Sequence, residues 1–591
     1  MKFFENENNK RLWEFFGFFL ALFIGLGPRI WFIHKFPIEQ RSDFLNILEF
    51  AQALQQNLFA PGWWWHYFAP GIPLILGGVL NLLPGISPNT VALWATAIVS
   101  GLISLAPYLI WKNVFPIPIR ILGAILLGIW PAQVYYSNTL AQDNWVLLPA
   151  VTLAALSIRT LAKPERTFPI LGSILYALAL SIRQDMLLVL LPLLFSTCFG
   201  TNFDIKQQWR AGIKSLIALS IALGFLIVQR GVASGRYALS SEHLGLALVG
   251  TYAPGSGLNW VVPWGYLERV HPQPIPDDQL EKVSTELALQ EFSKRPGFHM
   301  VRMATSVYYY TNNMETLLWW SLPDRPIGNK NTYIGVHLFI IHSLFLMALF
   351  VFFWQSKVFK YTWQVILAIL LKLGLHAVTV SQPRYFLIVL AFEILLITVA
   401  MDEILKGFSF KLTMSAITAG ILSFSGITVL GNSAKDYVLE HTWGIEQDEF
   451  SLSISEVSVT CKAENAQLMY FFNNVAAFNF RTTNPVPGDS ATLLCTASSK
   501  HPHQLILSFE DSFGGEGSPN HVAYVITANN QQIIWHDIGA KTWTGWVENV
   551  NLGTIDNETP LAFTISIQML EEDPGREWGN SSHMIFKLDT R

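Results

Sequence analysis

Over roughly its first 430 residues the chain alternates between long apolar stretches and shorter polar connections. A helix needs about 20 apolar residues to cross a bilayer, and about eleven stretches reach or approach that length. They lie at about residues 15–33, 88–111, 115–131, 145–161, 168–182, 186–199, 213–229, 333–354, 361–380, 384–401 and 411–430. The pattern predicts an α-helical polytopic membrane protein.

The pattern changes abruptly from about Lys435. Short runs in which apolar and polar residues alternate, such as QLILSF, HVAYVITA, QQIIWHD and LAFTISIQ, are separated by Gly, Asn, Asp and Pro. Alternation of this kind predicts strands, and their close succession predicts a β-sandwich. We therefore expect a transmembrane domain over residues 1–432, with large loops at 34–87 and 230–332, and an all-β domain over residues 435–591.

Composition supports a membrane protein. Of the 591 residues, 51% are hydrophobic and 14% are charged, whereas a soluble protein has about 25% charged residues. The net charge of −4 comes with no basic face carrying spaced aromatic residues, so we expect no nucleic-acid partner. The first apolar stretch is too long for the core of a signal peptide and is read as a retained membrane helix.

The basic residues predict the orientation of the helices. With a cytoplasmic N-terminus, alternate loops hold most of the lysines and arginines, as the positive-inside rule expects. These residues are Lys112, Arg120, Arg159, Lys163, Arg166, Lys206, Arg210, Lys214, Lys357, Lys360, Lys406 and Lys411. Counting the short segment Pro70–Leu83 as a span would invert this pattern, so we expect a helix lying in or dipping into the outer leaflet. The all-β domain then lies outside, and we favour a bacterial plasma membrane over that of the endoplasmic reticulum.

Three cysteines constrain the chemistry little. Their spacing is unlike that of a CxxC metal site. Cys198 lies in an apolar segment and is expected to be a buried free thiol. Cys461 and Cys495 fall in two strand-like runs and would form a disulfide only if that part of the chain faces an oxidising compartment.

The short loops predicted on the outer side carry the candidate chemistry. Asp43, next to Arg41, opens a helical pattern and is explained equally well as a cap or as a carboxylate that takes a proton from an acceptor. Trp63, Trp64 and Trp65 fit an interfacial aromatic belt or a stacking wall for a sugar or lipid headgroup. His66 is either interfacial or a donor to a phosphate.

Further along the chain, other charges fall on the same predicted side. Asp143 begins a membrane helix, where capping is also an adequate explanation. Arg183 either pairs with Asp185 or snorkels, or it holds a lipid-linked phosphate. Arg384 and Tyr385 stand at the outer end of a late helix. Charges that converge at one membrane face call for a substrate that is itself partly in the membrane.

These motifs, in this order and on this side, resemble the GT-C superfamily of membrane glycosyltransferases, especially its protein O-mannosyltransferase-like and aminoarabinose-transferase-like branch. The resemblance covers about residues 10–430 and rests on Asp43 and on the stretches APGIPLILGG, YYSNTLAQD, SIRQD and QPRY. It implies Asp43 as the catalytic base and Asp143 as a second acid. The basic residues that it places near the donor phosphate or lipid are Arg41, His66, Arg183 and Arg384.

The resemblance implies transfer of a hexose or pentose, with inversion, from a polyprenyl phosphate to a protein, glycan or lipid acceptor. It implies no certain cofactor and leaves a divalent cation possible. Relatives carry two adjacent acids in the first loop, but Phe44 follows Asp43 here, which weakens any inference that such a pair holds a divalent cation. The alternatives are a transporter or flippase for a lipid-linked glycan, and a non-catalytic anchor for the tail, which loosely resembles carbohydrate-binding jelly rolls.

Two charges stand apart from this predicted site. Lys372 and Glu393 lie within consecutive apolar stretches, at similar expected depth. An isolated charge near the bilayer centre costs about 2.5–3.5 kcal/mol. Either the two side chains pair or nearby groups such as His376 hold them, and we expect an ion pair between the two helices, outside the catalytic site.

Overall fold

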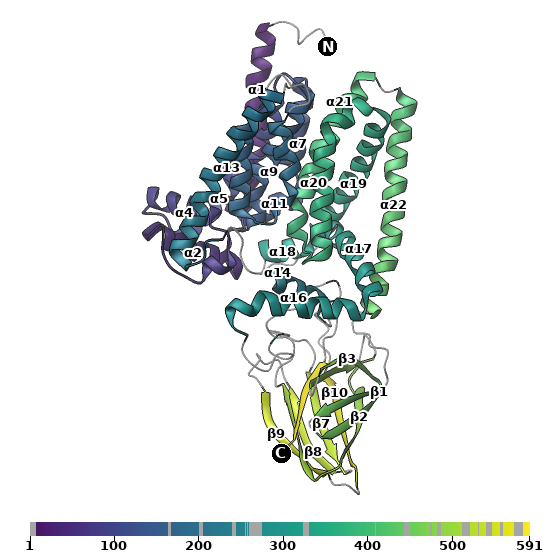
Figure 1. The fold of residues 1–591 in the computed structure, drawn as a ribbon. Coiled ribbons are helices and arrows are strands. Elements are labelled where there is room, and N and C mark those ends of the chain that lie inside the picture. The colour runs from purple at the N-terminus through teal and green to yellow at the C-terminus, as the bar shows by residue number, and fades with distance from the viewer. Residues whose placement is uncertain are drawn as a thin grey trace. The chain divides into compact units, whose positions relative to one another are not determined.

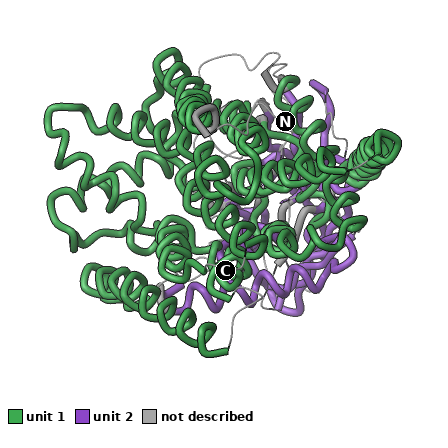
Figure 2. Tube along the Cα trace, turned by 90° about the horizontal axis from the view of Figure 1, so that it is seen from above, with its two compact units in different colours: residues 1–244, 301–435 green, residues 245–300, 436–591 purple. Residues whose placement is uncertain are grey.

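The computed structural model describes most of the chain. The residues described are 7–163, 167–199, 205–238, 244–253, 256, 258, 267, 275–322, 330–407, 409–441, 449–454, 456–472, 475–481, 486–510, 521–529, 531–538, 546–555, 559–571 and 583–590. They form two compact units, one of residues 1–244 and 301–435 and the other of residues 245–300 and 436–591 (Figure 2). Residues 245–300 thus group with the tail and not with the transmembrane part.

The first unit is helical (Figure 1). Its elements are α1 (Glu7–Lys35), α2 (Asp43–Gln56), α3 (Trp64–Tyr67), α4 (Gly71–Leu82), α5 (Pro88–Leu102), α6 (Leu105–Ile110), α7 (Ile117–Gly128), α8 (Pro131–Tyr136), α9 (Gln142–Ala162), α10 (Pro169–Ile182), α11 (Met186–Val189), α12 (Leu191–Cys198), α13 (Ile205–Ser234), α17 (Pro296–Asn312), α18 (Glu315–Ser321), α19 (Lys330–Trp354), α20 (Ser356–Val378), the 3₁₀ turn η2 (Pro383–Phe386), α21 (Leu387–Gly407) and α22 (Phe410–His441). The long helices run roughly parallel or antiparallel to one another.

Within the described residues, eight helices are long and apolar enough to cross a membrane. They are Arg11–Lys35, Pro88–Ile110, Gln142–Ala162, Ile205–Ser234, Thr332–Trp354, Ser356–Val378, Pro383–Gly407 and Phe410–Val438. Each of the eleven predicted stretches falls on a helix, but three of them coincide with the shorter apolar helices Ile117–Gly128, Pro169–Ile182 and Met186–Cys198. The predicted short segment at Pro70 is the helix α4.

A buried arginine explains how the short helix α7 can end inside the bundle. Arg29 of α1 is fully buried and donates hydrogen bonds of 2.7 Å to the carbonyls of Gly25 and Gly128, and one of 3.3 Å to that of Leu127. The last carbonyls of a helix have no partner within it. Arg29 therefore satisfies the end of α7 and ties it to α1.

The second unit contains two helices and a β-sandwich. The helices are α14 (Leu244–Tyr252) and α16 (Asp277–Lys294). The described strands are β1 (Glu449–Ile454), β2 (Val457–Glu464), β3 (Ala466–Phe472), β4 (Val475–Phe480), β5 (Ser490–Ser499), β6 (His503–Glu510), β7 (His521–Ala528), β8 (Gln531–Ile538), β9 (Trp546–Ile555), β10 (Leu561–Glu571) and β11 (His583–Thr590).

The strands form two antiparallel sheets in the described part of the chain, with orders β1-β2-β5-β10-β7-β8 and β3-β4-β11-β6-β9. Alternate residues are buried along β2 and β5, as expected when one face of a sheet packs on the other. Phe509 of β6 meets Tyr524 of β7 across the core, with ring centroids 5.6 Å apart. Cys461 and Cys495 face each other on β2 and β5 and form a disulfide. The predicted fold class is confirmed.

Candidate active site

The candidate residues all lie at helix ends on one side of the helical unit. Asp43 is the first residue of α2 and Asp143 the second of α9. Arg183 directly follows α10, Asp185 precedes α11, and Arg384 lies in the 3₁₀ turn η2 between α20 and α21. Helix starts, a helix end and a 3₁₀ turn therefore bring these charges to the same end of the bundle.

A buried glutamine joins the two segments that carry Asp43 and Asp143. Nε2 of Gln40 donates to the carbonyl of Asn138 at 3.0 Å, and its Oε1 accepts from the amide of Leu140 at 2.8 Å. The side chain of Asn138 in turn donates to the carbonyl of Phe36 at 3.0 Å. These bonds fix the first loop against the start of α9. Neither residue was singled out in the sequence.

Arg183 is held by two carboxylates. Its Nε and Nη2 donate to Oδ1 and Oδ2 of Asp185 at 2.9 and 3.1 Å, and its Nη1 forms an ion pair with Oδ1 of Asp143. Only 11% of the Arg183 side chain and 6% of the Asp143 side chain are exposed. The guanidinium thus has acid partners on two sides, which leaves it little capacity for a further anion.

Two side chains of α20 also contact the carboxylate of Asp185. Nζ of Lys372 lies 2.5 Å from its Oδ2, and Nε2 of His376 lies 3.3 Å from the same oxygen. Burial tends to raise the pKa of Asp185, but the charges of Arg183 and Lys372 hold that pKa well below its usual value. The charges of Asp143 and Asp185 raise the pKa of Arg183, against the effect of its burial.

The predicted pair between Lys372 and Glu393 is wrong. Lys372 pairs with Asp185, and Glu393 lies 2.9 Å from Nδ1 of His342 on α19. The positions along the two apolar stretches predicted the depth of each charge but not the direction in which it points around its helix. Because α20 packs on α11 and α12, Lys372 belongs to the candidate site.

Arg384 is held more loosely than Arg183. Its Nη2 is 3.7 Å from Oδ2 of Asp43, and its Nε is 3.9 Å from Oδ2 of Asp143. Among the described residues, that Nε has no hydrogen-bond partner. Nη2 donates weakly to the hydroxyl of Tyr385 at 3.4 Å. Arg384 thus bridges two acids at distances that leave its donors available.

Aromatic rings separate and orient the two arginines. The guanidinium carbons of Arg183 and Arg384 lie 4.5 and 5.2 Å from the ring centroid of Tyr385. The hydroxyl of Tyr136 is buried, and its pKa is raised by burial and by the charge of Asp143, with Arg384 acting in the opposite sense. Tyr136 lies within the YYSNTLAQD motif but was not predicted as a site residue.

Asp43 is the most accessible acid of the group. Its side chain is 54% exposed, against 6% for Asp143. Within the described part of the chain, the preceding Ser42 makes no side-chain capping hydrogen bond and has a φ of 52°, a conformation that a residue other than glycine adopts at a cost. Asp43 itself is inside the helix and not at the cap, so capping is a poor explanation for it.

The rest of the first loop is divided between packing and exposure. Trp65 is fully buried and donates from its indole to the carbonyl of Ala60 at 2.8 Å, while Trp64 stacks on Phe50. Trp63 is 46% exposed, so it alone of the three presents much of its ring. Next to these rings His66 is half-buried, and Arg41, just before Ser42 and Asp43, is exposed.

Among the described residues, the acids of the site are not gathered into a group of three or more possible metal ligands. Divalent cations such as Mg²⁺ and Ca²⁺ take several oxygen ligands. In the described ranges, no group of three or more His, Cys, Asp or Glu side chains is arranged to hold a metal ion. The carboxylates of Asp43 and Asp143 both face Arg384 instead. The two carboxylates are thus bridged by the guanidinium of one arginine.

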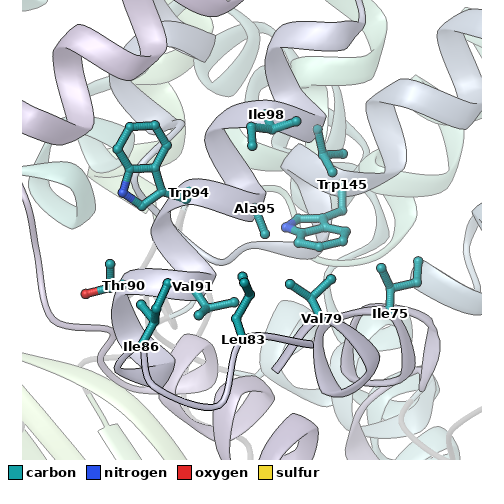
Figure 3. A pocket seen from close by; sticks show the side chains of 11 residues that line it. Ile75, Val79, Leu83, Ile86, Thr90, Val91, Trp94, Ala95, Ile98 and Trp145 are labelled. Atoms are coloured by element: carbon teal, nitrogen blue, oxygen red, sulfur yellow. The ribbon is translucent and has the colours of Figure 1, made fainter. Parts of the chain in front are cut away.

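An apolar groove of about 430 Å³ lies near the start of α9 (Figure 3). Its lining comes from α4, α5 and α9. The residues are Ile75, Val79, Leu83, Ile86, Thr90, Val91, Trp94, Ala95, Ile98, Val99 and Trp145. Trp145 follows Asp143 by two positions, and its indole donates to Thr96 at 3.0 Å. At the other end of α4, a side chain on Gly71 would collide with Ser181, two residues before Arg183. Helix α9 thus lines the groove and also carries Asp143, and α4 lines it and also contacts the segment that leads to Arg183.

Comparison with known proteins adds distant structural neighbours. No protein-family model and no curated protein matches the sequence. The chain is similar to the oligosaccharyltransferase AglB from Archaeoglobus fulgidus in complex with an inhibitory peptide and a dolichol-phosphate, with a TM-score of 0.40 and 13% identity. It is also similar to a structure of the oligosaccharyltransferase of A. fulgidus with Zn and sulfate (TM-score 0.37, 12% identity) and to the arabinosyltransferase EmbB from Mycobacterium smegmatis (0.27, 11%).

The matches cover 73%, 71% and 97% of this chain but 56%, 53% and 64% of the other three. The chain therefore spans between about half and two thirds of the length of these neighbours. They are membrane glycosyltransferases with the GT-C fold, the superfamily that the sequence motifs resemble. At these TM-scores the likeness is distant, so function has to be argued from the residues of the site.

Proposed function

We propose that the protein is an inverting membrane glycosyltransferase that takes its sugar from a polyprenyl phosphate. The observation that carries the proposal is the contrast between two acids that share one arginine. Asp43 is exposed and loosely paired, whereas Asp143 is buried and held by Arg183. An accessible carboxylate next to a guanidinium with available donors suits a base beside an anion-binding group.

In the proposed reaction Asp43 takes the proton of an acceptor hydroxyl or amine. The acceptor oxygen or nitrogen then bonds to the anomeric carbon, and the bond from that carbon to the phosphate oxygen breaks. The electron pair leaves with the polyprenyl phosphate, whose negative charge grows in the transition state. Arg384 stabilises that charge, since donors aimed at developing charge are the main source of catalysis in such sites.

Arg183 and Asp143 have supporting roles in this proposal. Asp143 orients Arg384 through its Nε, next to the Nη2 that faces Asp43, and Arg183 holds Asp143 in place. His66, Arg41 and the exposed face of Trp63 lie on the same loop as Asp43 and are proposed to contact the donor headgroup or the acceptor.

The apolar groove supports a lipid-linked donor. It is lined almost wholly by aliphatic and aromatic side chains, with the hydroxyl of Thr90 at its margin (Figure 3). We propose that part of the polyprenyl chain lies there. A donor that brings its own leaving group within the bilayer needs no nucleotide-binding loop.

We further propose that the site and the β-sandwich face the outside of the membrane. The disulfide between Cys461 and Cys495 supports this orientation, since disulfides persist in oxidising compartments. Arg384 at the start of η2–α21 belongs to the site end of the bundle, and α22 returns toward that end before the β-sandwich begins. An outer β-sandwich and an outer site are therefore consistent with one topology, in which the N-terminus is cytoplasmic.

The deciding experiment is transfer by the purified protein in lipid nanodiscs. Polyprenyl phosphates carrying radiolabelled hexoses or pentoses would be incubated with peptide, glycan and lipid acceptors, and label in the product would be counted. Transfer that requires the protein supports the proposal. Movement of the labelled lipid between leaflets without any transfer would instead favour a flippase.

A further inference from the structure

A lysine inside a membrane helix is connected to the candidate site. Lys372 lies six residues before the last residue of α20, which is about 9 Å along the helix axis. Its side chain is 1% exposed and its ammonium contacts Oδ2 of Asp185. A buried charge in a membrane helix is costly and usually marks a functional position.

From Lys372 a series of charges of alternating sign runs to the surface. Each neighbouring pair lies within 4 Å; the side chain of the first member is 1% exposed, those of the four middle members are between 6% and 17% exposed, and that of the last is 54% exposed. The members in order are Lys372, Asp185, Arg183, Asp143, Arg384 and Asp43. Three positive and three negative groups therefore balance one another, and we name this set the charge chain.

We propose that Lys372 is a positioning residue that sets the geometry of Arg384 through the charge chain. This inference rests on the proposed function for its catalytic consequence but not for its structural one. The ammonium of Lys372 neutralises Asp185 from one side, so that Arg183 can divide its donors between Asp185 and Asp143. Asp143, being satisfied by Arg183, leaves Arg384 shared with Asp43.

Removal of the lysine charge should shift every later contact. Asp185 would keep a poorly compensated negative charge in a low-dielectric site, where an unbalanced charge is expensive. It would draw Arg183 away from Asp143. Asp143 would then capture Arg384, whose Nε is already within 3.9 Å, and the donors of Arg384 would no longer face Asp43 or a phosphate.

The chain offers a matched control in the same bundle. Glu393 and His342 are also buried, with side chains 5% and 8% exposed, and form a close pair between α21 and α19. Their pair has no contact with a member of the charge chain among the described interactions. Glu393→Gln therefore perturbs a buried charge in the membrane part without touching Arg384.

The experiment compares Lys372→Met, the double variant Asp185→Asn/Lys372→Met, and Glu393→Gln with the wild type. The folded protein is labelled with phenylglyoxal and then digested, and the label on the peptide with Arg384 is quantified by mass spectrometry. This labelling reports the availability of the Arg384 guanidinium without any substrate. Transfer kinetics give kcat and the KM for the donor separately, per folded molecule.

We expect labelling of Arg384 to slow at least about fivefold in Lys372→Met and to recover in the double variant, because the second change restores the balance of charge. The KM for the donor should rise in Lys372→Met and return toward the wild-type value in the double variant. Glu393→Gln should label and turn over like the wild type. Unchanged labelling in Lys372→Met overturns the inference, as does slowed labelling that the double variant fails to restore.

The labelling result also separates this inference from the proposed function. If the wild type transfers no sugar from any polyprenyl donor, the proposed function fails. The labelling of the three variants still decides whether Lys372 positions Arg384.

Discussion

Replacing Asp43 with asparagine should abolish most sugar transfer and leave the fold intact. The side chain is 54% exposed and its contact with Arg384 spans 3.7 Å, and an exposed ion pair of this kind contributes only about 0–1 kcal/mol to stability. Loss of a general base costs about 10²–10⁴-fold in rate, which corresponds to about 2.7–5.4 kcal/mol of activation free energy. The two effects differ enough to be separated.

The assay measures initial rates of transfer from a radiolabelled polyprenyl-phosphate sugar and normalises them to folded protein. Glu49→Gln is the matched control, because Glu49 is another exposed acid on α2. It should transfer at the wild-type rate and match the thermal stability of Asp43→Asn. A well-folded Asp43→Asn variant that turns over within about threefold of the wild type would refute the role of Asp43 as base.

Four further outcomes follow from the site and the fold. Arg384→Ala should weaken binding of polyprenyl phosphate by about 10–100-fold, since a charge-assisted hydrogen bond contributes about 1.5–3 kcal/mol, and unchanged affinity in a titration would contradict its role. Arg183→Ala should lower the free energy of unfolding by about 3–5 kcal/mol, because the buried Asp143 loses its close partner and Asp185 loses one of its cations; a melting temperature equal to that of the wild type would contradict this. Cys461→Ser should destabilise the β-sandwich by about 4 kcal/mol, given a separation of 34 residues along the chain, which denaturant unfolding followed in the β-sandwich can test against the oxidised wild type. Ala95→Trp should fill the groove and raise the KM for long-chain donors but not for short-chain ones; equal KM changes for both would argue against a chain in the groove.

Sequence periodicity predicted the fold well because each element is specified locally. Every predicted apolar stretch lies on a helix, and each run chosen in the tail is a strand, as in β6, β7, β8 and β10. The assignment of full membrane spans was less secure. Helices such as α7 and α10 are shorter than a bilayer needs. The end of α7 is completed by the buried Arg29, which binds the side chain of Gln133 and backbone carbonyls that no sequence pattern marks.

The site was predictable only in part. Asp43, Asp143, Arg183, Asp185 and Arg384 were found because polar residues at the ends of apolar segments stand out, and the structure brings all five together. The predicted site did not include Gln40, Asn138, Tyr136 and Lys372, which lie inside apolar or loop segments. Their roles depend on which neighbour a helix turns toward, and this is a property of packing between helices.

Arg183 and Arg384 show why packing decides function here. In the sequence they are equivalent: each is an arginine at the predicted outer end of an apolar helix. In the structure Arg183 is bound by two carboxylates at hydrogen-bonding distance, whereas Arg384 meets its two acids only at 3.7 and 3.9 Å. An arginine whose donors are already used can organise a site but has little left for a phosphate. Two arginines therefore have different roles: Arg183 organises the site and Arg384 is proposed to bind the phosphate. We attribute the difference to Lys372, because it adds a second cation to Asp185. Arg183 can then hold Asp143 while Arg384 stays available.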